Sequence, residues 1–333
     1  ICLEKKYTSP YFSSVKSPLL TDAPLFAKSR VMTTTDTKTP DAVTNWVDDM
    51  PSGLRPYLRL MRADRPVGVW LLFIPCLWGT LIAQPEGMTA SQFWGLFLLF
   101  LVGAFVMRSA GCIYNDIIDR DIDAKVARTA ARPLVSGQVS LREAWILLVA
   151  LCLVGLIVLI QMGLTAIFVG FGSLLLVAAY PFMKRITWWP QAWLGLTFNW
   201  GVLVGAAAVT GSVPLSALFY YAAGIFWTLG YDTIYAHQDR EDDALVGVKS
   251  SARRLGSASR AAVAAFYGLT ILLAAAALLL EGGTAGLWLL LPAIGHFGWQ
   301  VLRLDFSESA QCLGLFKSNV WAGALLCVPA LLT

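Results

Sequence analysis

The sequence predicts an all-helical integral membrane protein. Of its 333 residues, 57% are hydrophobic and only 14% are charged, whereas about 25% of the residues of an average soluble domain are charged. The apolar residues form long continuous runs and do not alternate with polar residues, as they would in the strands of a membrane barrel. Because only helices and closed barrels satisfy their backbone hydrogen bonds inside a bilayer, these runs indicate membrane-spanning helices.

About nine apolar runs approach the roughly 20 residues that a helix needs to cross a bilayer. They lie at 66–84, 92–114, 142–160, 164–181, 190–209, 213–235, 259–279, 284–303 and 314–332. The short connections 161–163 and 210–212 predict helical hairpins. We expect these helices to form a single transmembrane domain over residues 55–333.

The distribution of basic residues supports this number of spans. With nine spans, all 25 lysines and arginines fall on the N-terminal side of the membrane, and the opposite connections carry Glu86 and Glu281. By the positive-inside rule, the N-terminal side is cytoplasmic in a bacterium or faces the matrix in a mitochondrion. The modest net charge of +4 is accounted for by this topology and does not suggest nucleic-acid binding.

Residues 1–54 are polar and rich in Ser, Thr, Lys, Pro and Asp. This composition predicts a disordered N-terminal segment outside the membrane domain. Met32 is one candidate for the native start, and a mitochondrial transit peptide is the alternative interpretation. The segment carries Glu4, Asp22 and a single arginine before Met32, which is not typical of a transit peptide. We therefore expect a bacterial inner membrane in preference to a mitochondrial inner membrane.

An acidic stretch follows the second apolar run. Asn115, Asp119 and Asp123 recur every four residues, so a helix would carry them on one face. Carboxylate and amide oxygens are suitable ligands for Mg²⁺, which usually completes its shell with water and substrate phosphate. Acidic residues at the end of a membrane span are costly and usually mark a functional site.

A second acidic stretch follows the sixth apolar run. Asp232, Tyr235, Asp239 and Asp243 are spaced so that one continuous helix would carry them on one face. Asp232 lies inside the apolar run itself. Two carboxylate clusters at the ends of two spans predict a metal-bridged polyphosphate site, and their separation by four spans suggests a distant internal repeat.

Basic residues follow the first acidic stretch. Lys125, Arg128 and Arg132 could neutralise a leaving diphosphate. The alternative for Lys125 is that it only serves membrane topology. Arg62 is a candidate for binding a carboxylate, because a guanidinium group binds one in a bidentate manner. For Arg62, and for Lys184 at the end of the fourth span, the alternative is again that the charge only serves membrane topology.

With these motifs, the chain resembles the UbiA superfamily of membrane prenyltransferases. The stretches that carry the resemblance are 60–68, 108–123, 128–134, 180–191 and 231–250. The sequences Tyr-Pro-Phe-Met-Lys-Arg at 180–185 and Tyr-Asp-Thr-Ile-Tyr-Ala at 231–236 resemble those of the 4-hydroxybenzoate branch of the superfamily. Arg65 departs from the pattern of the stretch 60–68, where lysine is common at this position, but it keeps the charge.

The resemblance implies about nine helices around a central cavity that opens sideways to lipid. It implies transfer of a polyprenyl group from polyprenyl diphosphate to the ring carbon ortho to the hydroxyl group of 4-hydroxybenzoate, in ubiquinone biosynthesis. Asn115, Asp119 and Asp123 would hold one Mg²⁺, and Asp239 with Asp243 a second.

The resemblance also assigns roles around these metals. Asp232, Asp116 or a nearby acid would orient the phenol or accept the ring proton, and Arg62 would bind the carboxylate of the aromatic acid. The remaining residues expected to bind the diphosphate or the aromatic acid are Lys125, Arg128, Arg132, Tyr180, Lys184 and Tyr235. Two alternatives stay open: a related prenyltransferase with another aromatic acceptor, and a magnesium-binding membrane transporter.

Overall fold

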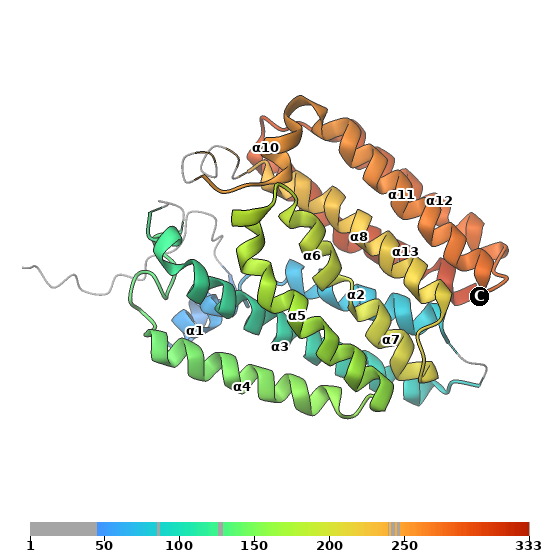
Figure 1. Ribbon diagram of the computed structural model, residues 1–333, viewed down its shortest axis with the longest axis horizontal. Helices are drawn as coiled ribbons and strands as arrows, with labels where there is room; N and C mark the ends of the chain where they lie inside the picture. Colours follow the sequence, from blue (N-terminus) through green and yellow to red (C-terminus); the bar gives the residue numbers. More distant parts are fainter. Residues whose placement is uncertain are drawn as a thin grey trace, which may run out of the picture. The chain divides into compact units, whose positions relative to one another are not determined.

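Helices make up the regular structure of this protein. The computed structural model describes residues 45–84, 87–125, 129–238, 240, 244 and 247–332, and within these ranges it contains helices and no strand (Figure 1). The 3-10 helix η1 (Trp46–Asp49) and helix α1 (Arg55–Leu60) precede the long apolar helices. The predicted all-helical fold class is therefore confirmed.

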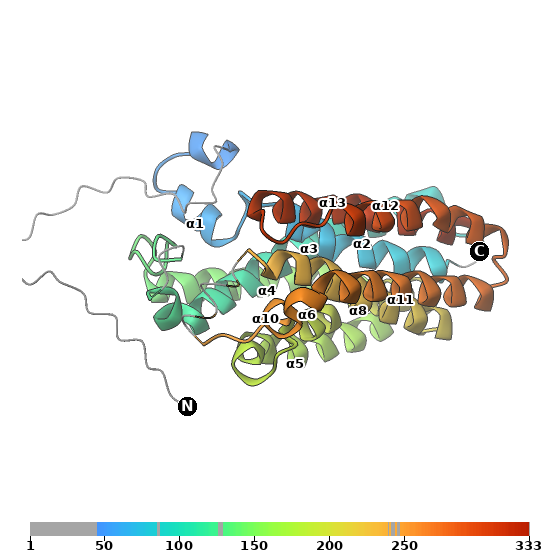
Figure 2. The same ribbon diagram turned by 90° about the horizontal axis from the view of Figure 1, so that it is seen from above.

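The apolar part of the chain consists of helices in close succession. Their bounds are α2 (Val67–Ile82), α3 (Ala90–Asp123), α4 (Leu141–Leu159), α5 (Leu164–Ile186), α6 (Pro190–Phe198), α7 (Gly201–Thr210), α8 (Leu215–Ala236), α10 (Ser251–Leu255), η2 (Gly256–Ala258), α11 (Ser259–Leu280), η3 (Ala285–Leu290), α12 (Leu291–Arg303), α13 (Ser309–Cys327) and η4 (Pro329–Leu332). Figures 1 and 2 show that the long helices run side by side.

Each of the nine predicted spans falls on a helical segment of the described chain. Seven segments are long and apolar enough to cross a membrane. Helix α2, with 16 residues, is shorter. Helix α8 is not among the seven, because its tyrosines and Asp232 lower its hydropathy. The prediction of about nine spans thus agrees with the order of the helices, while length and hydropathy alone support seven of them.

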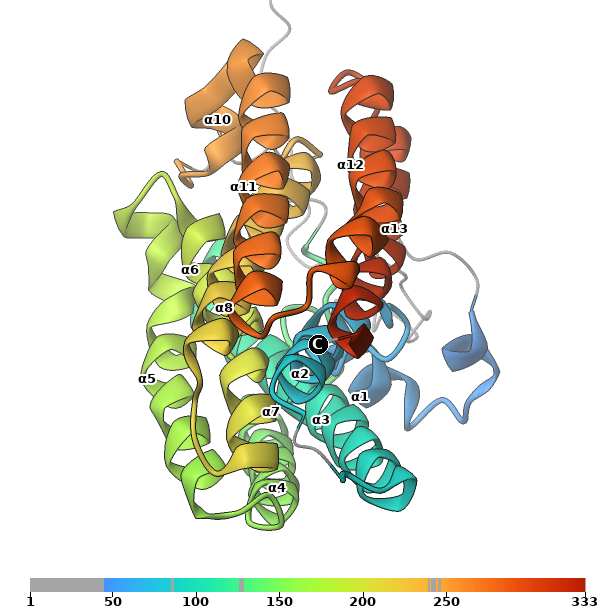
Figure 3. The same cartoon turned by 90° about the vertical axis from the view of Figure 1, so that its right-hand side faces the viewer.

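Helix α2 lies at the centre of the helix packing. It contacts α3, α7, α8 and α13, and Figure 3 shows it end-on among these helices. Trp78 of α2 is completely buried, and its indole Nε1 donates a hydrogen bond of 2.9 Å to the carbonyl oxygen of Gly323 in α13. A helix surrounded by protein in this way does not need the length of a lipid-facing span.

Helix α3 continues past the bilayer core. Its 34 residues correspond to about 51 Å at 1.5 Å per residue, whereas the hydrocarbon core is about 30 Å thick. The helix begins with a capping box between Thr89 and Gln92. The predicted acidic stretch, up to Asp123, therefore continues the same helix beyond the apolar run without a break.

A buried polar network joins helices α8, α11, α12 and α13. The Asn319 Oδ1 atom accepts hydrogen bonds from Trp227 Nε1 at 3.0 Å and from the Tyr267 hydroxyl at 3.3 Å. The Asn319 amide nitrogen donates to Gln300 Oε1 at 3.2 Å. Asn319 is completely buried, so the hydrogen bonds among these side chains replace those that water would otherwise make.

We expect Asn319→Leu to destabilise the helix bundle by about 1–3 kcal/mol, because it leaves the buried indole N–H of Trp227 without its acceptor. Thermal unfolding of the detergent-purified protein measures this loss. Gln161→Leu is the matched control, since the Gln161 amide bonds only locally to the Ile157 carbonyl in an exposed position. Equal melting temperatures for the two variants would contradict the role given to the network.

Candidate functional site

A large cavity opens among the helices near the acidic end of α3. Its volume is about 1020 Å³, at the upper end of the range for small-molecule sites. The segment before α2 and helices α2, α3, α5 and α8 all contribute to its wall. Among its polar lining residues are Arg62, Asp64, Arg65, Arg108, Cys112, Asn115, Asp116, Arg132, Tyr180, Asp232, Tyr235, Gln238 and Lys317.

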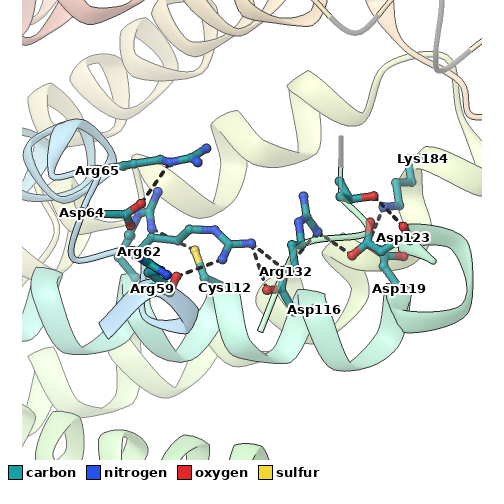
Figure 4. A network of polar contacts seen from close by, with 12 residues as sticks. Arg59, Arg62, Asp64, Arg65, Cys112, Asp116, Asp119, Asp123, Arg132 and Lys184 are labelled. Carbon is teal, nitrogen blue, oxygen red and sulfur yellow. Dashed lines mark hydrogen bonds and ion pairs between the residues drawn. The ribbon is translucent and has the colours of Figure 1, made fainter. Parts of the chain in front are cut away.

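Asp116 is the centre of a charged cluster in this wall (Figure 4). Its two carboxylate oxygens accept hydrogen bonds from Arg62 Nη2 at 2.8 and 2.9 Å, and Oδ1 also accepts one from Arg132 Nη1 at 3.1 Å. The Asp116 side chain is only 2% exposed. This buried carboxylate therefore forms ion pairs with two guanidinium groups.

Arg62 reaches Asp116 from an unusual backbone conformation. Its φ is 58°, in the left-handed region that residues other than glycine rarely adopt. Its Nη1 donates to the carbonyl oxygen of Arg59 at 3.0 Å. Burial alone would lower the pKa of the Arg62 guanidinium, but the neighbouring carboxylates of Asp116 and Asp64 outweigh it and raise that pKa above its ordinary value. Arg62 therefore stays charged and is held in place.

A second charged cluster lies farther along α3. The buried carboxylate of Asp119 forms an ion pair with the Lys184 ammonium group and accepts a hydrogen bond of 3.1 Å from Arg185 Nη2. Asp123 forms an ion pair with Arg132, so Arg132 links the two clusters. Helix α3 thus presents three carboxylates that cationic side chains from α5 and from the loop after α3 neutralise.

Two predicted residues of α8 lie across the cavity. Asp232 and Tyr235 both line it, and the Tyr235 ring packs on Phe316 with 4.6 Å between the ring centroids. The side chain of Asp232 forms no hydrogen bond or ion pair with another residue of the described chain. Tyr180, at the end of α5, also lines the cavity.

The predicted site residues are only partly brought together. The cavity is lined by Asn115, Asp116, Arg62, Arg132, Tyr180, Asp232 and Tyr235. The neighbouring ion pairs are formed by Asp119, Asp123 and Lys184. Lys125 is exposed just beyond the end of α3. Arg128, Asp239 and Asp243 lie outside the described residues.

The predicted helical face of the second acidic stretch needs a correction. Helix α8 ends at Ala236, and His237 and Gln238 form a turn. A single continuous helix from Asp232 to Asp243 is therefore wrong, and among the described residues the shared face holds Asp232 and Tyr235. The spacing of residues predicts a common face only as long as the helix continues.

The α3 residues fit a hard divalent cation by their donor chemistry. Asn115, Asp119 and Asp123 supply only oxygen donors, the ligand type that Mg²⁺ prefers. In the described parts of the chain, however, no three acidic, histidine or cysteine side chains converge on a single point. A cation bound here would thus need oxygens from a bound phosphate group to complete its shell.

Arg108 and Gln238 are cavity residues that the motifs alone do not assign to the site. The amide nitrogen of Gln238 and the Nε atom of Arg108 are buried without a hydrogen-bond partner. The available signal for Arg108 is its position inside the apolar run 92–114, where a charged residue is costly and usually functional.

His237 lies beside the site but packs away from it. Its Nε2 shares a hydrogen bond of 2.9 Å with the Ser259 hydroxyl, and its ring stacks on Phe306 with 3.7 Å between centroids. Burial, and to a lesser degree the charge of Arg240, lower the pKa of His237 to about 4. These contacts make His237 a structural residue.

The low pKa of His237 predicts a loss of stability in acid. Below about pH 6.5 the unfolded chain binds a proton at this histidine, whereas the folded protein binds it only near pH 4. The free energy of unfolding should therefore fall as the pH decreases through this window, by up to about 3 kcal/mol. Melting temperatures in detergent at pH 7 and pH 5 test this. In His237→Gln the fall should be smaller, and an undiminished fall would assign it to other groups.

A polytopic helical membrane protein with two charged clusters beside a large cavity has the arrangement of an enzyme that handles a phosphorylated lipid. The UbiA prenyltransferase family matches residues 72–323. The chain belongs to this family, as its motifs predict, and it is a multi-pass membrane protein.

Several curated relatives cover most of the chain. The mitochondrial 4-hydroxybenzoate polyprenyltransferase of Caenorhabditis elegans is 45% identical over 282 residues, which are 84% of this chain and 79% of that protein. The protein of that name from Homo sapiens is 44% identical over 284 residues, 84% of this chain and 76% of its own. The Arabidopsis thaliana protein is 44% identical over 85% of this chain and 70% of its own. These names do not support the expected preference for a bacterial membrane.

Solved structures share the fold. The apo structure of a UbiA homologue from Aeropyrum pernix K1 matches with a TM-score of 0.65 and 27% identity, over 78% of this chain and 94% of that chain. A homologue from Archaeoglobus fulgidus bound to GPP and Mg²⁺ matches with a TM-score of 0.62 over 83% of this chain and 98% of that chain. Its identity is 19%, so this second likeness concerns the fold alone.

Proposed function

We propose that this protein transfers a polyprenyl group from polyprenyl diphosphate to the carbon of 4-hydroxybenzoate next to the hydroxyl group, in ubiquinone biosynthesis. The observation that carries the proposal is the pair of charged clusters on α3 beside a cavity of about 1020 Å³. The names of relatives that are 45% and 44% identical support the choice of acceptor.

The diphosphate would bind at the second charged cluster, around Asp119 and Asp123. Lys184, Arg185 and Arg132 already gather around the α3 carboxylates, and they would offset the charge of the departing diphosphate. Asn115, Asp119 and Asp123 would hold one Mg²⁺, with Asp239 and Asp243 as ligands of a second. When bound, Mg²⁺ stabilises the negative charge that develops on the leaving group.

The reaction breaks the bond between the first prenyl carbon and the diphosphate oxygen, and forms a bond from that carbon to the aromatic ring. The ring then loses a proton. Asp116 is already engaged in ion pairs with two guanidinium groups. Asp232 has no such partner within the described chain and faces the same cavity. We therefore favour Asp232 as the group that accepts the proton or orients the phenol.

The enzyme would lie in the mitochondrial inner membrane with its charged clusters on the matrix side. The names of the relatives support the mitochondrion, and the basic side of the chain supports the orientation. Protease added to sealed mitoplasts should leave the loop after Asp123 intact and cut it only after detergent treatment. Cleavage in sealed mitoplasts would contradict this orientation.

The first test is transfer of a labelled polyprenyl diphosphate by the detergent-purified protein. The acceptors are 4-hydroxybenzoate, homogentisate and dihydroxynaphthoate, each with and without Mg²⁺. Asp119→Ala should abolish transfer, and Glu281→Ala, on the opposite side of the membrane, should retain it. Transfer to a different acceptor would show that the assignment of 4-hydroxybenzoate as the substrate is wrong. If protein that still binds Mg²⁺ transfers the label to none of the acceptors, its assignment as a prenyltransferase would be wrong, and a magnesium transporter would be favoured.

A further inference from the structure

Two buried polar atoms in the cavity wall lack a hydrogen-bond partner, and one is an acceptor while the other is a donor. The side chain of Asp64, in the segment before α2, is only 6% exposed. Its Oδ2 accepts a hydrogen bond of 3.3 Å from Arg65 Nε, but its Oδ1 has no partner within the described chain. The amide nitrogen of Gln238, in the turn after α8, is likewise buried without a partner there. Unpaired buried polar groups are costly, which indicates that a ligand completes both.

Asp64 and Gln238 lie at the same end of the helix bundle. The cavity is lined by both residues, by the first turns of α2 and by the last turns of α8, so the two helices run along it in opposite directions. Trp78 of α2 packs on Trp227 of α8 with 5.0 Å between the ring centroids. Asp64 precedes Trp78 by 14 residues and Gln238 follows Trp227 by 11, which correspond to about 21 Å and about 17 Å of helix. The two free atoms therefore lie at a similar depth in the cavity.

The chemistry of these two atoms fits a hydroxyl group. A carboxylate oxygen accepts hydrogen bonds, and an amide nitrogen donates them. A hydroxyl group donates its own proton and accepts at its oxygen, so one hydroxyl group can bond to Asp64 and Gln238 together. A carboxylate or a diphosphate offers only acceptor oxygens, which the Asp64 carboxylate would repel. Of the two proposed substrates, only 4-hydroxybenzoate carries a hydroxyl group.

Asp64 is separated from the cations proposed for the diphosphate. Lys184 and Arg185 pair with Asp119, whereas Figure 4 shows Asp64 and Arg65 at the opposite end of the charged network. A hydroxyl group at Asp64 and a diphosphate at Asp119 would therefore have separate partners.

Resting on the proposed function, we propose that Asp64 and Gln238 bind the hydroxyl group of the aromatic acceptor. The phenol O–H donates to Asp64 Oδ1, and the Gln238 amide donates to the phenol oxygen. Asp232, six residues before Gln238 on the same cavity wall, is then left to accept the ring proton.

This contact also assists the reaction. The electron pair of the broken C–O bond leaves with the diphosphate, and a π-electron pair of the ring forms the new bond to the prenyl carbon. Positive charge then spreads from the ring to the phenol oxygen, so its O–H becomes a stronger donor and its bond to Asp64 strengthens in the transition state. Loss of the ring proton to Asp232 restores the aromatic ring.

The test compares two acids that differ only in the hydroxyl group. In equilibrium dialysis without donor or Mg²⁺, the native protein should bind labelled 4-hydroxybenzoate more tightly than labelled benzoate. Asp64→Asn should weaken binding of 4-hydroxybenzoate by about tenfold, because a neutral acceptor replaces a charged one, and Gln238→Leu by about 2- to 10-fold. Both variants should bind benzoate within about twofold of the native protein. The matched controls Asp49→Asn and Gln161→Leu, at exposed positions, should bind both acids normally.

Two outcomes would overturn the inference. Equal weakening for both acids would assign Asp64 and Gln238 a structural role, and unchanged binding of 4-hydroxybenzoate would show that its hydroxyl group binds elsewhere. Prenyl transfer by the native protein, measured in parallel, keeps the proposed function separate. If the variants lose the preference for 4-hydroxybenzoate but the native protein transfers no prenyl group, the proposed function alone is wrong. If the native protein transfers and the variants keep the preference, this inference alone is wrong.

Discussion

Asp232→Asn is expected to lower the rate of prenyl transfer by about 10²- to 10⁴-fold, the range for loss of a positioned general base. The substitution is nearly isosteric and removes no ion pair, because Asp232 has none with another described residue. The variant should therefore fold normally and bind both substrates with little change in KM. Initial rates at saturating donor and acceptor, together with the melting temperature, measure the two effects separately.

Asp305→Asn is the matched control for this prediction. Asp305 lies in the exposed connection between α12 and α13, where its carboxylate accepts hydrogen bonds from the Ser307 backbone and hydroxyl group, and it does not line the cavity. Its loss should leave the rate unchanged. If Asp232→Asn retains the rate within about threefold while Asp116→Asn abolishes it, Asp116 takes the proton and the assignment of Asp232 is wrong.

The parts of the fold that depend on long apolar runs and on the distribution of charged residues could be predicted from the sequence. Long apolar runs predicted the order of the helices, and the one-sided distribution of basic residues favoured about nine crossings, of which length and hydropathy support seven. The acidic stretch up to Asp123 was correctly expected to continue the second span, because polar residues at helical spacing are tolerated once the helix leaves the bilayer. The break between α6 and α7 at Asn199 was not predicted, since no proline or charge marks it.

The site was less predictable because its contacts join distant parts of the chain. The pairing of Arg62 with Asp116 crosses 54 residues, and it requires a left-handed backbone at Arg62 that no sequence rule indicates for arginine. Which cation neutralises which carboxylate depends on helix rotation and loop path. Arg132, for example, bonds both Asp116 and Asp123. The residue types of the site could be predicted, but their partners required the structure.

The contact between α2 and α7 gives the second large prediction, because their backbones meet with no side chain between them. A Cβ atom at Gly79 would lie 1.9 Å from the carbonyl oxygen of Val202, and one at Gly205 would lie 2.3 Å from that of Cys76. Gly201 and Gly205 form the small-xxx-small spacing by which membrane helices approach closely. A methyl group at either position can be accommodated only if the helices move apart.

Gly79→Ala is therefore expected to destabilise the protein by about 3 kcal/mol or more, at or above the upper end for overpacked cores, and to reduce the yield of monodisperse protein. Gly95→Ala in α3, where nothing lies within 4 Å of the added atom, should have little effect. Melting temperatures equal to those of Gly95→Ala would mean that α2 and α7 are not in close contact in the membrane.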